Sequence, residues 1–508
     1  MNLPSNIRAI IFLLAFGVVF TLTTQAQTDS PSTELPQRQT DSHKDPQADD
    51  VEVLKLRVNQ LEKLVEQQQR LMSAMEKRLG EVEEKNAALT KPATAPAVET
   101  KSVDATIATA PKSGTPSTNE KATAPAQENK PLAGWNKDHA FLQSADGSFT
   151  TNIIGFAQFD FRGYQAGDHP PDTFLVRRAR LGVEGKLANY FDYRVQGDFA
   201  DTRNTLLRDA FLTIHKTDEF QLRFGQFKEP FSQEEMSSIT NIDFVERSMA
   251  DNLAPSRSPG VMAFGLINKG VFEYAIGAFN GKGLLANNNN NTPEGIVRFR
   301  FSPLKNKLGS MFKNFAFGGA YAQGRNQDGV SVTGQTESRS FMFFAPEPVN
   351  GKITRANGEF SWTLRQAQIR AEYDQVNQAR EGLGLGGSDL PGVVAKAFVG
   401  QFTYLLTGEN KSETNPVTPK HELFSNDGSA RGFGAWELKA RFARLQVADA
   451  TAKSNHAASF YFGANWYMNR FLKYVIDFGI ERFNDPVRSP NPKDRNYFVH
   501  LNRLQFTF

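Results

Sequence analysis

Arginine side chains recur on the polar face of stretches whose other face is apolar. In each stretch charged and apolar residues alternate, so that its arginines project from one side. A guanidinium group donates two parallel hydrogen bonds to an oxyanion and keeps its proton at physiological pH. The spacing therefore indicates a wall that could bind phosphate or another small anion. The arginines that alternation places on this face are Arg178, Arg180, Arg223, Arg298 and Arg300.

The same arginines have a structural alternative. An arginine that pairs with a carboxylate on a neighbouring stretch braces the wall instead of contacting a solute. The candidate partners are Glu184, Asp192, Asp198 and Asp209. Arginine supplies 26 of the 42 basic residues in 151–508, which favours oxyanion contact without deciding between the two roles.

The segment from Phe174 to Phe199 shows which element must position these arginines. From Ala179 to Leu187, apart from glycines, the odd positions are apolar and the even positions are polar. A period of two is that of a β-strand and excludes a helix. The alternation resumes after residues 188–190, which predicts two long antiparallel strands joined by a tight turn.

Strand pairs of this kind recur up to Phe508, the last residue. A soluble β-sandwich is the alternative, but its apolar face would need a second apolar layer. Hydrophobic residues make up only 39% of the chain and its mean hydropathy is −0.46, which excludes a helical membrane protein. The 42 Phe against 4 Trp fit a lipid-facing surface rich in aromatic rings. The pattern predicts an all-β fold, a transmembrane antiparallel β-barrel in the outer membrane of a Gram-negative bacterium.

The connections between the expected strands differ in length. Short turns are predicted to be periplasmic and long loops extracellular. At about 22 residues for a strand with its connection, residues 150–508 hold roughly 16 strands, enough for an aqueous channel. The short connections are 188–190, 302–307 and 468–470, and the long ones are 281–293, 325–352, 408–431 and 484–495.

Residues before the barrel fall into four segments. Residues 1–26 are typical of a signal peptide, with Arg8 before an apolar run and a small-residue cleavage site at Thr24-Gln25-Ala26. Residues 27–50 are polar and predicted to be disordered. Residues 51–90 keep a heptad pattern in which ten of twelve a and d positions are apolar, so a coiled coil is predicted. Residues 91–134 form an Ala/Thr/Pro-rich linker, and residues 135–508 form the barrel.

The coiled coil predicts self-association. Valine at a with leucine at d leans towards two strands, which leaves dimer and trimer open. Because the coiled coil precedes the first strand, we expect it in the periplasm, where it could contact the cell wall.

Several short motifs, in this order, make residues 140–508 resemble the phosphate-selective porin O and P family. The motifs are SADG at 144–147 with GFAQ at 155–158, FLVRRARL at 174–181, RFGQF at 223–227, VER at 245–247, YLLTGE at 404–409, GAWEL at 434–438 and GANWY at 463–467. The resemblance implies a homotrimeric, 16-stranded outer-membrane porin that passes anions, with one loop folded into the barrel.

By family position, basic residues that line the selective zone match Arg177, Arg178, Arg223 and Arg247. Arg177 falls in the opposite phase from Arg178, so it needs a β-bulge or a strand end to point inward.

The connection 228–259 is the candidate constriction. Its apolar residues suit a loop packed inside the lumen better than one in water. The loop also carries more carboxylates than basic residues, and phosphate specificity is in doubt if these face the pore. Glu246 could instead orient its neighbour Arg247. The carboxylates are Glu229, Glu234, Glu235, Asp243, Glu246 and Asp251.

Other functions find little support in the residues. The chain has no Cys, and its seven His residues show no metal spacing, so neither a metal nor a cofactor is expected. The glycines of 382–387 lie between strands, without the strand-to-helix setting of a nucleotide site. A net charge of +3 gives no reason to expect nucleic acid binding, and no catalytic set is found. We expect passive diffusion of small anions, inorganic phosphate first. The alternatives are a general or weakly selective porin and an envelope-tethering structural protein.

Overall fold

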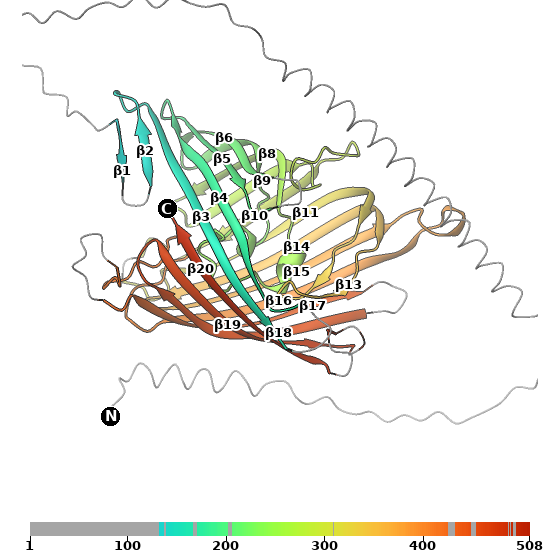
Figure 1. The fold of residues 1–508 in the computed structure, drawn as a ribbon. Helices are drawn as coiled ribbons and strands as arrows, with labels where there is room; N and C mark the ends of the chain where they lie inside the picture. The colour runs from blue at the N-terminus through green and yellow to red at the C-terminus, as the bar shows by residue number, and fades with distance from the viewer. Residues whose placement is uncertain are drawn as a thin grey trace, which may run out of the picture. The chain divides into compact units, whose positions relative to one another are not determined.

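Sixteen antiparallel strands form one closed sheet in the computed structural model of the chain (Figure 1). The last strand pairs with residues 156–164 of the first, which closes the barrel. The barrel of about 16 strands predicted from the sequence is confirmed. The structure describes residues 132–508 apart from 137–138, 166–169, 202–205, 308, 425–431, 449–453, 486, 488 and 491–493.

The barrel strands are β3 (Phe149–Tyr164), β4 (Thr173–Leu187), β5 (Phe191–Asp198), β6 (Leu207–Thr217), β7 (Phe220–Lys228), β8 (Arg257–Ile267), β9 (Phe272–Phe279), β10 (Glu294–Phe301), β11 (Phe315–Val330), β14 (Pro348–Leu364), β15 (Ala367–Arg380), β16 (Leu390–Leu405), β17 (Ala435–Ala448), β18 (Ser454–Tyr467), β19 (Leu472–Phe483) and β20 (Asn496–Thr507).

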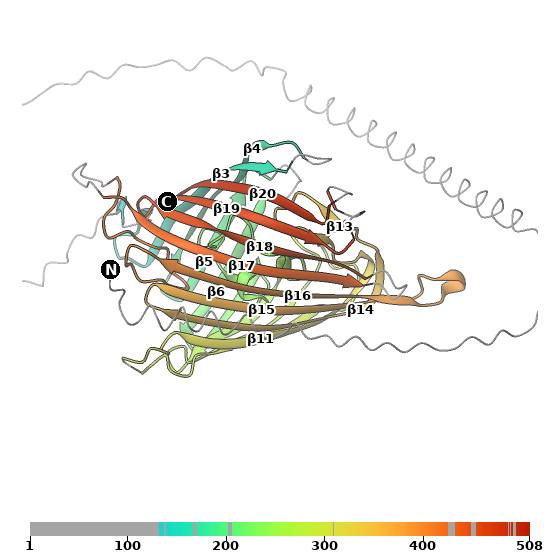
Figure 2. The ribbon, with the colours of Figure 1, turned by 90° about the horizontal axis from the view of Figure 1, so that it is seen from below.

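The two faces of the sheet follow the alternation. Along β17, Glu437, Lys439 and Arg441 point into the lumen and are buried, whereas Leu438 and Phe442 point outward and are 49% and 44% exposed. The strands β14 to β20 run side by side in Figure 2. Large apolar side chains exposed on the outside and ionic ones inside match lipid outside and water within.

Two short strands precede the barrel, β1 (Ala133–Trp135) and β2 (Ala140–Gln143). β2 pairs with the first part of β3, and β20 takes over the same edge further along. At the change of partner, Gly155 and Phe508 exchange two backbone hydrogen bonds of 2.9 Å. A Cβ at Gly155 would lie 2.5 Å from the Phe508 ring, so glycine lets the end of the chain close the seam (Figure 1).

The rim that holds Phe508 is called here the C-terminal rim, and the other is the opposite rim. The predicted turn at 188–190 lies on the C-terminal rim and is confirmed, since β4 ends at Leu187 and β5 begins at Phe191. Ala188 and Asn189 have φ of 49° and 61°, the positive values that a tight hairpin turn uses.

The sequence predicted that the long connection 408–431 lies at the opposite end of the barrel from the short turns. This prediction is wrong. β16 ends beside the turn between β14 and β15, because Tyr404 pairs with Ala367. The connection from β16 to β17 therefore leaves the C-terminal rim together with the short turns. The connection is long because it extends into the barrel, where the buried Lys411 ammonium donates to Asp243 at 2.5 Å.

The connection between β7 and β8, the constriction loop (residues 229–256), folds into the lumen. It contains α3 (Gln233–Met236) and the 3₁₀ turn η1 (Met249–Asn252). Phe231, Phe244 and Val245 are at most 1% exposed, which confirms that its apolar residues pack inside the barrel. The far wall also holds its backbone: Lys439 Nζ donates to the Asp243 carbonyl at 2.6 Å.

The connection between β11 and β14 also folds inward, with β12 (Gly334–Gln335) and β13 (Met342–Phe344). Its Ser338 N–H donates to Glu481 on β19 at 2.8 Å. Arg339 Nη2 reaches Asp251 of the constriction loop at 2.8 Å, so the two inward loops contact each other. The sequence predicted only a long polar loop here and missed the inward course.

The signal peptide (1–26), the disordered segment (27–50), the coiled coil (51–90) and all of the linker (91–134) up to residue 131 lie outside the described residues. Among the residues that are described, no helix is long and apolar enough to cross a membrane.

Asp243 tests how the constriction loop is held. We expect Asp243→Asn to weaken the hold on Lys411, which keeps Glu437 as a partner, and to loosen the loop, because losing a hydrogen bond to a charged group costs about 1.5–3 kcal/mol. Trypsin cleavage of the detergent-solubilised protein after Arg247 should then be at least about tenfold faster. Asp389→Asn, in the exposed β15–β16 connection, is the control. Equal cleavage rates in both variants would contradict this account of the anchor.

Candidate functional site

A cavity of about 470 Å³ lies between the constriction loop and the wall formed by β3 to β8. Seven basic side chains line it, against two carboxylates, Glu184 and Asp209. The basic residues are Arg178, Arg180, Arg194, Arg223, Lys228, Arg247 and Arg257. Basic side chains therefore outnumber carboxylates on the surface of this water-accessible space.

The constriction loop contributes Met236, Ser238, Ile239, Thr240 and Arg247 to the lining. None of its six carboxylates is among the described residues that line the cavity. The acidic character of the loop sequence therefore does not appear on the cavity surface.

Four of the loop carboxylates pair with basic side chains of the loop itself, the wall or the other inward connections. Glu235 pairs with Arg247 and lies 3.8 Å from Arg257. The remaining contacts are Glu234 with Arg441 at 3.1 Å, Asp243 with Lys411 at 2.5 Å and Asp251 with Arg339 at 2.8 Å.

Glu229 behaves differently from these four. Burial raises the pKa of its carboxyl to about 8, and the nearby Glu294 carboxylate adds to the shift. Glu229 is therefore largely protonated at neutral pH and brings little negative charge to the lumen.

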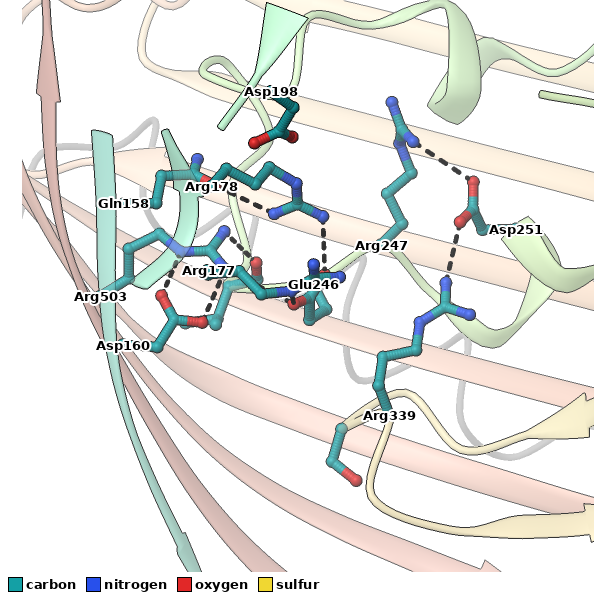
Figure 3. A network of polar contacts seen from close by, with 12 residues as sticks. Gln158, Asp160, Arg177, Arg178, Asp198, Glu246, Arg247, Asp251, Arg339 and Arg503 are labelled. Atoms are coloured by element: carbon teal, nitrogen blue, oxygen red, sulfur yellow. Dashed lines mark hydrogen bonds and ion pairs between the residues drawn. The ribbon is translucent and has the colours of Figure 1, made fainter. Parts of the chain in front are cut away.

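Glu246 is the centre of the densest ionic cluster (Figure 3). Its Oε1 accepts from Arg162 and from Arg177 Nε, both at 2.5 Å, and its Oε2 accepts from Arg178 Nη2 at 3.2 Å. Arg503 lies 3.5 Å away. Burial alone would raise the pKa of this carboxyl, but the surrounding guanidinium groups outweigh burial and hold the pKa well below its usual value. Glu246 therefore stays ionised.

Arg177 and Arg178 both reach Glu246 because β4 carries a bulge. The register between β3 and β4 shifts from Gln158 opposite Arg178 to Phe159 opposite Val176, which leaves Arg177 without a partner residue. The bulge that the sequence required for Arg177 is present. Two adjacent arginines thus point to the same side of the strand.

Asp160 supports the same cluster from the wall. Arg503 binds both of its oxygens, at 2.7 and 2.8 Å, and Arg162 donates to it at 2.9 Å. The side chains of Asp160 and Arg503 are at most 1% exposed.

Three of the predicted arginines lie in the cavity wall with different partners. Arg180 pairs with Asp198 at 2.9 Å, which is the bracing alternative considered for it, and it still lines the cavity. Arg223 donates to the Thr213 hydroxyl at 2.9 Å, and its guanidinium carbon lies 4.2 Å from the centre of the Phe211 ring. In the described part of the chain, no carboxylate lies within 4.0 Å of Arg223. Arg247 pairs with Glu235.

Arg298 and Arg300 lie apart from these residues on β10. Arg298 binds Glu359 at 2.5 Å, and Arg300 binds Glu413 at 2.5 Å. Neither lines the cavity. The structure thus brings together Arg177, Arg178, Arg180, Arg223 and Arg247 near the constriction loop but leaves these two in wall salt bridges.

Several basic residues of the cavity and its surroundings were not selected from the sequence. Arg194 lies on the polar face of β5, so alternation alone could have identified it. Lys228 is the last residue of β7 and Arg257 is the first residue of β8, the two strands that flank the constriction loop. At a strand end, alternation does not predict to which face a side chain points. Arg162 and Arg503 also lie on polar faces, but only the closure of the barrel joins them.

The model of the phosphate-selective porin O and P family matches residues 152–508, nearly all of the barrel. The chain belongs to this family. It is therefore an outer-membrane porin, a β-barrel channel. No curated protein matches the chain in sequence.

Solved structures of other outer-membrane proteins are similar to this porin at low identity. OmpT of Vibrio cholerae in its trimer form is 11% identical with a TM-score of 0.47, covering 71% of this chain and 100% of its own. The channel DcaP of Acinetobacter baumannii is 10% identical with a TM-score of 0.47, covering 72% and 99%. An anion-selective porin from Comamonas acidovorans is 10% identical with a TM-score of 0.42, covering 71% and 100%.

Asp160 tests whether the cluster stabilises the barrel. Asp160→Asn leaves the buried guanidinium groups of Arg162 and Arg503 with one carboxylate fewer, at a cost of about 3–5 kcal/mol. We expect a clearly lower Tm for the barrel in detergent, followed by heat-dependent gel mobility. Asp192→Asn, which removes only a partly exposed contact with His215, should leave the Tm nearly unchanged. A Tm for Asp160→Asn as high as that of the wild type would refute this role.

Proposed function

We propose that this porin lets small anions, inorganic phosphate among them, diffuse passively across the outer membrane as a homotrimer. The observation that carries the proposal is the charge of the cavity beside the constriction loop. Seven basic side chains and two carboxylates line it, and the six loop carboxylates are absent from the lining.

The arrangement of charges supports anion passage on physical grounds. In a narrow space with little water, each fixed charge acts on an ion more strongly than it would in bulk solvent. Carboxylates such as Glu246 and Asp198 are almost fully buried behind the arginines that they neutralise. A solute in the cavity therefore meets guanidinium groups first. These groups match the paired oxygens of phosphate, which supports phosphate as a solute.

Weak selectivity is the second candidate, and the ion pairs favour it. Arg178, Arg180, Arg194, Arg247 and Arg257 each have a carboxylate partner. Paired charges attract a passing ion less than free ones. Arg223 is then the arginine on which selectivity depends most.

A reversal-potential measurement tests the proposal directly. We expect the full chain, in planar bilayers with a KCl gradient, to pass chloride at least about five times better than potassium, as about 1 kcal/mol of attraction gives. Inorganic phosphate should reduce the chloride current by competing for the arginines. A ratio near one would favour the weakly selective alternative. Potassium selectivity or absence of conductance would refute the proposal.

Arg223 allows a matched comparison with Arg298. Both point into the lumen, but Arg298 is bound to Glu359 and lies outside the cavity lining. We expect Arg223→Gln to weaken phosphate block of the chloride current by about tenfold, the value of one hydrogen bond to a charged group. Arg298→Gln should change it much less. Equal effects of the two variants would show that total lumen charge, and not this cavity, controls the block.

A further inference from the structure

Three basic side chains project from the outer face of the wall, which also carries exposed apolar side chains such as Phe398 and Phe442. They are Lys396 on β16, Arg444 on β17 and Arg482 on β19, and all three are exposed. The residues directly before and after each of them are at most 2% exposed and face the interior. Because side chains alternate along a strand, the three basic groups lie on the surface that faces the membrane.

The pairing of the strands brings these three side chains together. Lys396 is opposite Gln446, so Arg444 lies diagonally across from it, two residues away along β17. Arg444 and Arg482 are both opposite Ala458 of β18, one on each side of that strand. Diagonal neighbours on one face are about 7–8 Å apart, and next-but-one strands are about 10 Å apart. The three form one patch across β16 to β19, called here the outer basic patch (Figure 2).

The outer basic patch has no counter-ion in the described part of the chain. Among the described residues, no carboxylate lies within 4.0 Å of any of its three cations. The carboxylates of β16 to β19 are Glu437, Asp477 and Glu481, and each is at most 1% exposed, on the lumen face. A cation on the lipid face of a barrel costs free energy, least where the headgroups lie. An anion supplied by the surrounding membrane would therefore stabilise the patch.

The patch lies towards the opposite rim. Arg482 is the penultimate residue of β19, which ends at that rim, and Arg444 lies in the last third of β17. Tyr373, exposed on the outer face of β15, is near the same level, as is typical of a membrane interface.

The two rims differ in their connections. The C-terminal rim carries the tight turns 188–190, 218–219 and 365–366, whereas the opposite rim carries long connections such as 280–293. In outer-membrane barrels short turns face the periplasm and long loops face the outside. The outer basic patch is therefore at the headgroup level of the outer leaflet.

We propose that the outer basic patch binds the phosphate groups of lipid A, the membrane anchor of lipopolysaccharide in the outer leaflet. Lipid A carries phosphates on a disaccharide directly above its acyl chains. Arginine donates paired hydrogen bonds to phosphate oxygens, and lysine acts as a point charge. Basic clusters at headgroup level attract anionic lipids in this way. Phe398 and Phe442 lie next to the patch on the outer face, where the acyl chains pack against them. The inference concerns the outer surface and does not depend on which ion the pore passes.

Native mass spectrometry of the full chain in detergent tests the proposal, with bisphosphorylated lipid A as the added probe. We expect the triple variant Lys396→Gln/Arg444→Gln/Arg482→Gln to bind lipid A with a Kd at least about tenfold higher than the wild type. Monophosphorylated lipid A should bind the wild type less tightly and lose less in the variant. Arg444→Gln and Arg482→Gln alone should each give an intermediate loss, and they serve if the triple variant does not assemble.

The matched control is Lys269→Gln/Lys307→Gln/Lys313→Gln, which removes the same charge from exposed positions in connections of the C-terminal rim. Equal losses in the two triple variants, or equally tight binding of phosphatidylglycerol and lipid A to the wild type, would show attraction by net charge alone and overturn the proposal. Unchanged lipid A binding in the patch variant also overturns it. A patch variant that keeps lipid A but changes its number of subunits would instead assign the patch to a contact between copies. Because no current is measured, failure here leaves the proposed anion passage untouched.

Discussion

The interior of this porin depends on ionic and hydrogen-bonded contacts between the constriction loop and the far wall. A loop inside a barrel takes backbone carbonyls away from bulk water, and an unsatisfied buried carbonyl costs free energy. Lys473, Lys439, Arg503 and Arg441 donate, in this order, to the carbonyls of residues 242, 243, 245 and 246. The long basic side chains of β17, β19 and β20 thus replace water for the loop.

This use of the far wall divides the lumen by charge. The lumen-facing basic residues of β17, β19 and β20 donate to the loop, whereas basic residues of β4, β5, β7 and β8 line the cavity. The loop carboxylates turn away from the cavity to meet basic partners, with Asp243 bound to Lys411 and Glu246 bound to the arginines of the bulge. A loop with more acids than bases therefore leaves a positive passage beside it. The direction in which each charged side chain points, and not the count of acidic and basic residues, determines the charge that a solute meets.

The strands of the wall were predictable from the sequence because a period of two can be recognised from a few consecutive residues. It gave the strand pair around 188–190, the inward face of Arg178 and the need for a bulge at Arg177. It failed at β16, whose inward Val393, Ala395, Ala397 and Val399 are apolar because they belong to the core cluster with the inward loops. Because the alternation did not identify β16 as a strand, the connection that follows it, 408–431, was predicted at the wrong rim. An alternation rule detects a strand only where the lumen beside it is polar.

The alternation within each strand could not predict which carboxylates pair with the arginines. Arg178 and Arg298 share a residue type and an inward face, yet one meets a loop carboxylate 68 positions away and the other pairs with Glu359 on a nearby strand. Arg503 meets Asp160 across 343 positions because the barrel closes there. Alternation determines the face of the wall from which a charged side chain projects. The folded constriction loop then determines which charged side chains stay available to a solute. Candidate residues chosen from one strand therefore include both cavity arginines and bracing ones, and only the course of the constriction loop separates them.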